Sequence, residues 1–193
     1  MKKTFLNLML CMFALTVTGA TASAQMMNNK KMNGNPTVGG AAMYKTKNIV
    51  ENAMESPIHT TLVKAVVAAG LVDTLKGKGP FTVFAPTDDA FGKVDAATLN
   101  TVMQPENKAT LTKILTYHVV AGKMDSKAIA KAIKKGRGRA TFKTVSGGTL
   151  TASMQNGGVM LTDEKGGTAM VTTADVYQSN GVIHVIDTVV MPN

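Results

Sequence analysis

The chain has 193 residues, a formal net charge of +9 and a single cysteine. This length suits one globular domain whose core is stable without disulfides or metal ions, so a disulfide-stapled mini-protein is excluded. Because the one cysteine, Cys11, falls in a segment that we expect to be removed, the remaining chain should contain no thiolate nucleophile and no cysteine-ligated metal.

The first 24 residues have the pattern of a signal peptide. Lys2 and Lys3 form a positive start, residues 5–17 are apolar, and Ala22-Ser23-Ala24 is a small-residue cleavage site. The apolar run is too short to span a bilayer, and no later segment is long and apolar enough to do so. We therefore expect an exported product, periplasmic or extracellular, that begins at Gln25.

Residues 25–46 contain mostly Asn, Lys, Gly and Met without periodicity, which is typical of a flexible spacer. Met26, Met27 and Met32 could serve as soft metal ligands, but their spacing is irregular and no histidine accompanies them. We expect no metal site here, and the sequence predicts a folded domain over residues 47–193.

The first part of this domain has helical periodicity. Apolar residues recur at three- and four-residue spacing from residue 49 to residue 67, with Ser56 predicted to cap a second helix that begins at Pro57. Gly70 is predicted to end that helix, and Thr87 or Asp88 to cap a later one. Further helices are predicted over 71–75, 95–103, 105–116 and from Asp125 onward.

Strand patterns surround and follow these helices. They cover residues 81–85, 117–120, 142–145, 150–154, 159–161, 169–171 and 182–190, and glycine pairs typical of hairpin turns separate the later ones. Helices first and an antiparallel sheet later indicate an α+β fold. The last strand carries His184 and Asp187, whose odd spacing places them on opposite faces, so they cannot form one catalytic site.

The other polar residues have structural interpretations. Asp88-Asp89 is predicted to cap a helix, and Asp163-Glu164 to lie at a solvated hairpin tip. His59 is predicted to be exposed, and His118 and His184 to be structural residues of apolar strands. No phosphate-binding loop, dinucleotide fingerprint or nucleophile elbow is found, so no cofactor is expected.

A basic segment follows the last predicted helix. It contains Lys131, Lys134, Lys135, Arg137 and Arg139. The segment is either a solvated helix end or a patch for polyanions such as acidic polysaccharide, lipopolysaccharide or extracellular DNA. Specific nucleic-acid recognition is not expected, because Phe142 is the only aromatic residue nearby.

Three motifs together resemble the fasciclin (FAS1) family over residues 47–192. They are TVFAPTDDAF at 82–91, LTYHVV at 115–120 and NGVIHVIDTVVMP at 180–192. The resemblance implies a compact α+β fold, with small antiparallel sheets in a wedge or sandwich flanked by a helical layer. It also implies an extracellular adhesion or interaction module without enzyme activity.

In animal members of that family, partner contact is attributed to the Tyr-His motif and to an Asp-Ile pair before the last motif. The resemblance transfers these roles to Tyr117, His118, Asp175 and Val176, where valine replaces isoleucine. The residues themselves admit another interpretation, in which Tyr117 and His118 are hydrogen-bonded members of the core and His184 and Asp187 are polar clamps of the closing strand.

Three functional hypotheses follow. The first is a monomeric secreted module that binds a protein or glycan partner at the cell surface or in the matrix. The second is a carrier of a small ligand or lipid, which requires an apolar pocket between sheet and helices. The third is a hydrolase, which requires His118 or His184 in an open cleft.

Overall fold

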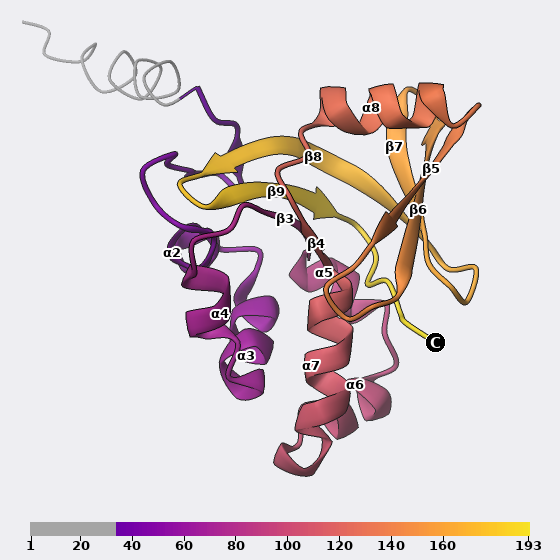
Figure 1. Ribbon diagram of the computed structural model, residues 1–193. Helices are drawn as coiled ribbons and strands as arrows, with labels where there is room; N and C mark the ends of the chain where they lie inside the picture. Colours follow the sequence, from indigo (N-terminus) through magenta and orange to yellow (C-terminus); the bar gives the residue numbers. More distant parts are fainter. Residues whose placement is uncertain (1–33) are drawn as a thin grey trace, which may run out of the picture.

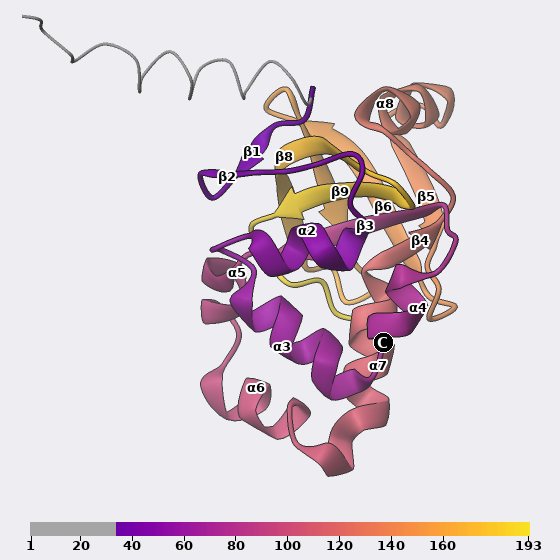
Figure 2. The ribbon, with the colours of Figure 1, turned by 90° about the vertical axis from the view of Figure 1, so that its left-hand side faces the viewer.

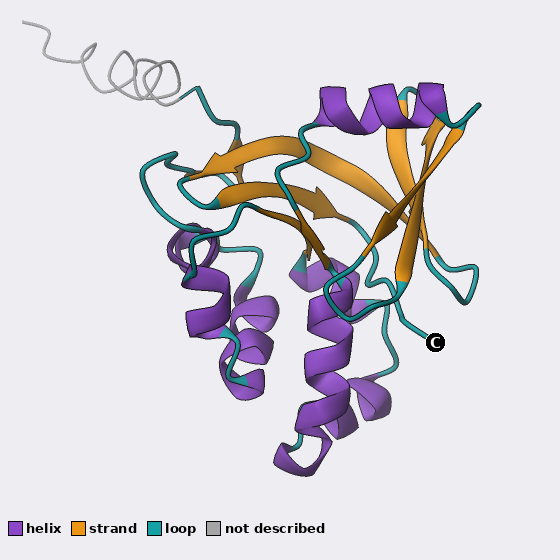
Figure 3. Ribbon diagram, in the orientation of Figure 1, coloured by secondary structure: helices purple, strands orange, loops and turns teal. Residues whose placement is uncertain are grey.

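The computed structural model describes residues 34–193, and seven of its strands form one sheet (Figures 1 and 3). The order across this sheet is β4, β3, β9, β8, β7, β6 and β5. The strand bounds are β3 Phe81–Pro86, β4 Val119–Ala121, β5 Arg139–Lys143, β6 Thr149–Gln155, β7 Gly158–Thr162, β8 Thr168–Gln178 and β9 Gly181–Ile186. All neighbours are antiparallel except β3 and β9, which are parallel.

Strand β8 joins the two halves of the sheet. Its 11 residues pair with β9 near its C-terminal end and with β7 near its start, and the register shifts twice between Val171 and Val176. Such irregularities bend a strand and increase its twist. The far edge curls back toward β4, where Val120 and Thr144 form an isolated bridge. The sheet is therefore a curved wedge.

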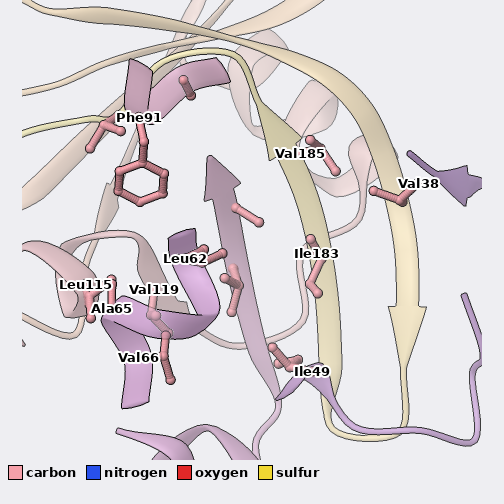
Figure 4. Close-up of a cluster of buried hydrophobic side chains, with 14 of the residues drawn as sticks. Val38, Ile49, Leu62, Ala65, Val66, Phe91, Leu115, Val119, Ile183 and Val185 are labelled. Carbon is pink, nitrogen blue, oxygen red and sulfur yellow. The ribbon is translucent and has the colours of Figure 1, made fainter. Parts of the chain in front are cut away.

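Two hydrophobic cores lie on opposite faces of the β3–β9 pair, because side chains alternate along a strand. Val83, Ala85, Ile183 and Val185 face the helical-side core, which Leu62 and Val66 complete from a helix (Figure 4). The sheet-end core lies between the two halves of the wedge. Its buried members include Phe84, Tyr117, Ile129, Ile133, Phe142, Leu150, Leu161 and Ile186.

The helices divide between these two cores (Figures 1 and 2). The helical layer beside β3 and β9 contains α2 Ile49–Glu55, α3 Thr60–Ala69, α4 Val72–Lys76, α5 Asp88–Gly92, α6 Ala96–Val102, the 3-10 turn η1 Pro105–Asn107 and α7 Lys108–Tyr117. The remaining helix, α8 Ser126–Lys135, packs against β5 and β6.

Side chains at the helix starts explain where these helices begin. Thr87, Asp95 and Asp125 each accept a hydrogen bond from the backbone N–H three residues later, and Asn48 and Glu51 form a capping box. Gly70 ends α3 in the left-handed region that glycine adopts without strain, with φ +70°.

Residues 34–46, predicted to belong to a spacer, instead pack on the domain. Two short strands, β1 Thr37–Val38 and β2 Ala41–Ala42, form a separate hairpin. Val38 and Met43 are buried in the helical-side core. The Asn35 side chain accepts from the Tyr177 N–H at 3.0 Å and donates to the Tyr177 carbonyl at 2.6 Å. The folded unit thus begins before residue 47, while the predicted signal peptide lies outside the described residues.

The α+β class and the order of the elements are as predicted, with local corrections to their bounds. β5 lies over 139–143 instead of 142–145, and β9 ends at Ile186, before Asp187. Ser56 ends α2 instead of starting α3, whose first helical residue is Thr60. The strand predicted over 117–120 begins at Val119, because Tyr117 is still helical. β8 continues far beyond the predicted residue 171. Within residues 34–193, no helix has the length and hydrophobicity required to cross a membrane.

Replacing Asn35 tests whether the first described residues belong to the folded unit. Asn35→Ala should lower the free energy of unfolding by about 1–3 kcal/mol, because it leaves the Tyr177 backbone groups unpaired. Asn100→Ala, on the exposed side of α6, is the matched control and should change it by less than about 0.5 kcal/mol. Equal urea-denaturation midpoints for the two variants would contradict the assignment.

Candidate functional site

Tyr117 connects three separate segments from inside the sheet-end core. The side chain is 0% exposed. Its hydroxyl donates to the Thr149 carbonyl at 2.6 Å and accepts from the Glu164 N–H at 3.1 Å. Burial raises the pKa of Tyr117 to about 12, so the phenol is neutral at physiological pH. Both hydrogen bonds of its hydroxyl are to the chain's own backbone.

Asp163 and Glu164 lie in the hairpin turn between β7 and β8, as predicted, but they are half-buried and also fasten the C-terminal residues to the sheet. The Asp163 carboxylate accepts from the Met191 N–H at 2.9 Å and from the Gly167 N–H at 2.7 Å. The Glu164 carboxylate accepts from the N–H groups of Thr149 at 2.9 Å and Asn193 at 3.2 Å. These hydrogen bonds, the one from Thr149 first, lower the pKa of Glu164.

His118 is a buried, neutral ring that joins α7 to the C-terminal segment. It is 3% exposed. Nδ1 lies 2.8 Å from the Ile114 carbonyl, to which it must donate, and Nε2 accepts from the Val190 N–H at 3.3 Å. Burial lowers the pKa of His118 to about 4. Both ring nitrogens are therefore occupied by backbone groups.

Asp175 and His184 together hold the start of α8. The Asp175 carboxylate accepts from the N–H and the hydroxyl of Ser126 at 2.7 and 2.5 Å. His184 donates from Nε2 to the Met124 carbonyl at 2.8 Å and accepts at Nδ1 from the Asp175 N–H at 3.4 Å. Burial lowers the pKa of His184, whose ring stacks on Phe84. Asp175 also has φ +61°, a conformation that aspartate tolerates better than most residues.

Val176 and Asp187 complete the set of predicted site residues. Val176 is 1% exposed and lies in the helical-side core. Asp187 accepts from the Met170 N–H at 2.8 Å, and its second oxygen lies 3.7 Å from the Lys93 ammonium group. His184 and Asp187 share no hydrogen-bond partner, so the structure does not bring them together.

These positions do not form an open site. Tyr117, His118 and Val176 are buried, and the carboxylate of Asp175 is engaged with Ser126. Neither His118 nor His184 has a ring nitrogen free to act as a base, so the structure does not support the hydrolase hypothesis that rested on these two residues. Within residues 34–193, no three His, Cys, Asp or Glu residues gather closely enough to hold a metal ion.

Two further polar predictions differ in their outcome. His59, predicted to be exposed, is 3% exposed, and burial lowers its pKa. Asp88 does cap a helix, but the helix is α3: its carboxylate accepts from the N–H groups of Thr60 and Thr61 at 3.2 and 2.7 Å. Partial burial opposes ionisation of Asp88, and the Thr61 and Thr60 hydrogen bonds outweigh it and lower the pKa.

The basic residues, by contrast, lie on the surface. Helix α8 buries Ile129 and Ile133 on one side and exposes lysines on the other, and Arg139 and Lys143 alternate with buried residues on β5. We call these exposed side chains the basic face: Lys127, Lys131, Lys134, Lys135, Arg137, Arg139 and Lys143. Residues 126–162 contain no Asp or Glu, and neither salt bridge within the described chain involves this face.

Two members of the basic face fall outside the segment predicted from the sequence. Lys127 precedes Lys131 by four residues, and Lys143 follows Arg139 by four residues. Helical spacing places the first pair on one side of α8, and strand alternation places the second pair on one side of β5. Extending these two periods beyond 131–139 would have found both residues.

The curved α+β wedge, whose segments are held together by buried polar side chains, is a fold of the FAS1 type. Comparisons with known proteins agree with this assignment. The family model described as Fasciclin domain matches residues 57–192. Protein sll1483 of Synechocystis sp. is 43% identical over 171 residues, which cover 89% of this chain and 86% of the relative. Cell surface glycolipoprotein MPB83 of Mycobacterium bovis is 33% identical over 164 residues, 82% of this chain and 67% of the relative.

Among solved structures, a FAS1 domain pair from the insect cell adhesion molecule Fasciclin I is similar with a TM-score of 0.66. The two chains are 19% identical, and the match covers 74% of this chain and 50% of the other, so this likeness supports the fold alone. The family model and the relatives above assign the family. The chain belongs to the fasciclin family.

Removing the Tyr117 hydroxyl tests its role as a connector. Tyr117→Phe should lower the free energy of unfolding at pH 7 by about 1–3 kcal/mol, because the Thr149 carbonyl and Glu164 N–H lose their partner. The folded-state pKa of about 12 exceeds the unfolded value of about 10, so this contribution is complete below pH 10 and is lost as the pH rises to 12. Tyr44→Phe is the control, since its hydroxyl makes no hydrogen bond within the described residues. Chemical denaturation at pH 7, 10 and 12 measures the difference.

His118 and His184 should both be neutral, and they should be in opposite tautomeric forms. Nitrogen-15 NMR at pH 7 should show the proton on Nδ1 of His118 and on Nε2 of His184. Because burial depresses the pKa of His118 to about 4, its contribution to stability is complete above pH 6.5 and decreases as the pH falls through 4. A His118 signal that titrates near pH 6.5 in the folded protein would refute this arrangement.

Proposed function

We propose that this chain is an exported fasciclin-type interaction module that binds an acidic polysaccharide at the cell surface or in the matrix. Membership of the family supports the class. The M. bovis relative is described as a cell surface glycolipoprotein, and this description supports the setting. The predicted signal peptide supports export to the periplasm or the cell exterior.

The basic face is the observation that carries the choice of partner. Seven cations are exposed on one helix and the adjoining strand with no carboxylate between residues 126 and 162. At 1.5 Å per residue, Lys127 and Lys134 lie about 10 Å apart along the axis of α8. Such a row of cations, which makes no salt bridge within the described residues, attracts a flexible polyanion along its whole length.

A polysaccharide is favoured over nucleic acid because the face offers no stacking surface. Phe142, the aromatic residue in this segment, is buried in the sheet-end core. Bases bind single-strand sites largely by stacking on exposed aromatic rings, whereas carboxylate or sulfate groups on a glycan need only cations and hydrogen-bond donors.

Asp175, which the family resemblance assigns to partner contact, serves this proposal indirectly, together with His184, a predicted structural residue. Asp175 and His184 bind the two ends of the short segment before α8, at Ser126 and Met124. They therefore fix the position of the helix that carries most of the basic face. We propose that they are positioning residues and that the lysines and arginines make the contact.

Charge reversal on α8 tests this function. Lys131→Glu with Lys135→Glu should weaken binding to heparin and alginate by about tenfold or more, because a cation near a polyanionic surface contributes about 1 kcal/mol. The matched control is Lys64→Glu with Lys78→Glu, two exposed lysines in the helical layer that give the same change in net charge. Affinity chromatography in a salt gradient measures the effect, and neutral dextran should not retain the protein.

The same experiment can reject the proposal. Equal losses in the two double variants would show attraction to net charge alone, without a defined face. Stronger retention by duplex DNA than by either polysaccharide at the same salt concentration would contradict the choice of a glycan partner. Urea-denaturation midpoints establish that all variants are folded.

A further inference from the structure

A cavity of about 180 Å³ lies within the helical-side core, between β3 and β9 on one side and helices α2, α3 and α4 on the other; Figure 4 shows several of the side chains around it. The lining side chains are mostly aliphatic and include Ile49, Val50, Leu62, Val66, Ile183 and Val185. For comparison, an apolar cavity of about 150 Å³ is known to hold benzene, which has six carbons. In proportion to its volume, this cavity accommodates a hydrocarbon chain of about seven carbons.

Exposed apolar side chains lead from the surface into this cavity. Met54 on α2 is 65% exposed and Val67 on α3 is 60% exposed, and both belong to the cavity lining. Among residues 34–193, the other large hydrophobic side chains with such exposure are Val145 and Met154, which do not line it. Apolar surface gathered at an opening is typical of a ligand entrance.

The interior of the cavity offers no polar group to a ligand. Asn52 and both ring nitrogens of His118 already bond backbone groups. The Ser56 hydroxyl and Nδ1 of His59 pair with each other at 2.7 Å. Nε2 of His59, whose ring interacts with the Ala85 carbonyl, has less than 1 Å² of accessible surface, so no ligand reaches it. The interior therefore accepts hydrocarbon and disfavours a polar or charged group.

A single cation lies at the surface end of the lining. Among the described residues that line the cavity, Lys76 alone carries a charge, and it is exposed. Lys76 makes no salt bridge within residues 34–193. The acidic residues of α2 and α4, which are Glu51, Glu55 and Asp73, are not part of the lining, and Glu55 is paired with Lys47. The entrance thus combines apolar surface with one unopposed positive charge.

We propose that this cavity binds a medium-chain fatty acid of about eight carbons, with the hydrocarbon chain inside and the carboxylate beside Lys76 at the entrance. The aliphatic interior selects a chain without a second polar group, and the lone cation selects an anionic head over a cationic one. The carboxylate stays in contact with water, so its binding avoids the cost of burying a charge. The volume is too small for the paired long chains of a membrane phospholipid.

This site is separate from the basic face, which α8 and β5 carry at the other end of the molecule (Figure 1). Loss of polysaccharide binding and loss of fatty-acid binding are therefore independent results. Variants of the basic face should leave the fatty-acid affinity unchanged, and variants of the cavity should leave retention on heparin unchanged.

A chain-length series on the unaltered chain tests the size of the site. Affinity should rise about fourfold per methylene from hexanoate to octanoate, because each methylene leaves water for the cavity. From octanoate to decanoate it should rise by less than about fourfold in total, because the cavity is then full. Methyl NMR titrations below the critical micelle concentration measure these affinities and should map the shifts to Val66 and Ile183.

Reversing the charge at the entrance tests the orientation of the ligand. At low salt, octanoate should bind the unaltered chain about threefold or more tightly than octylammonium, and Lys76→Glu should reverse this order, because an exposed ion pair contributes up to about fivefold in affinity. Lys165→Glu, at an exposed position in the turn between β7 and β8, gives the same change in net charge and should leave the order unchanged.

Filling the cavity provides a further variant. Val66→Phe adds volume at the lining and should reduce octanoate binding by at least about tenfold, whereas Val145→Phe at an exposed position away from the cavity should leave it unchanged. Urea-denaturation midpoints establish that the variants are folded. If Val66→Phe does not fold, the chain-length series on the unaltered chain still decides the matter.

Several results would overturn the proposal. Affinity that continues to rise fourfold per methylene through decanoate would show adsorption to an open apolar surface. The same preference for octanoate in Lys76→Glu as in Lys165→Glu would show attraction to net charge alone. Shifts that map away from the cavity, binding that survives Val66→Phe, or no binding up to the critical micelle concentration would each exclude this ligand.

Discussion

The parallel pairing of β3 with β9 is the constraint on which the structure depends. It joins a strand from the helical half of the sequence to the closing strand about 100 residues later, and both strands are buried on their two faces. Each strand must therefore supply one row of side chains to each core. Phe84 and Ile186 face the sheet-end core, while Val83 and Ile183 face the helices. Two of the three family motifs are these two strands.

Most polar residues of those motifs satisfy the backbone of neighbouring segments. Asn180 accepts from the Ile49 N–H at 3.0 Å and donates to the Leu75 carbonyl at 2.7 Å, so the turn before β9 binds the start of α2 and the end of α4. Tyr117, His118 and His184 make similar hydrogen bonds across the sheet-end core. A buried polar group with complete hydrogen bonding makes the fold specific without offering a contact surface. The exposed cations of α8 and β5 do not hold neighbouring segments together in this way.

Much of the fold could be predicted from local signals, because periodicity, caps and turn residues act over a few positions. The helix caps at Asp95 and Asp125, the end of α3 at Gly70 and the glycine-rich hairpins are of this kind. The start of α3 could not be predicted, since Asp88 caps that helix from 27 residues away. Residues 34–46 have no periodicity, and contacts with Tyr177, Asn52 and the core fix them.

The candidate sites show the same division between local and distant information. The basic face follows from spacing and composition, and the sequence indicated its central part. The hydrogen bonds that fix Tyr117 and Asp175 reach Thr149 and Ser126, 32 and 49 residues away, and no local pattern encodes them.

A cavity of about 180 Å³ in the helical-side core, lined by Val66 and Ile183 among others, makes the two ends of the domain mechanically unequal. Internal space disappears when a protein unfolds, so the unfolded state occupies the smaller volume and hydrostatic pressure favours it. Compression should therefore act first on the helical layer around Val66 and Ile183, where the unfilled volume lies. The sheet-end core, which Tyr117, His118 and His184 hold together by hydrogen bonds, is the less compressible part. Pressure should therefore unfold the helical half before the sheet half, whereas heat or urea should unfold both in one transition.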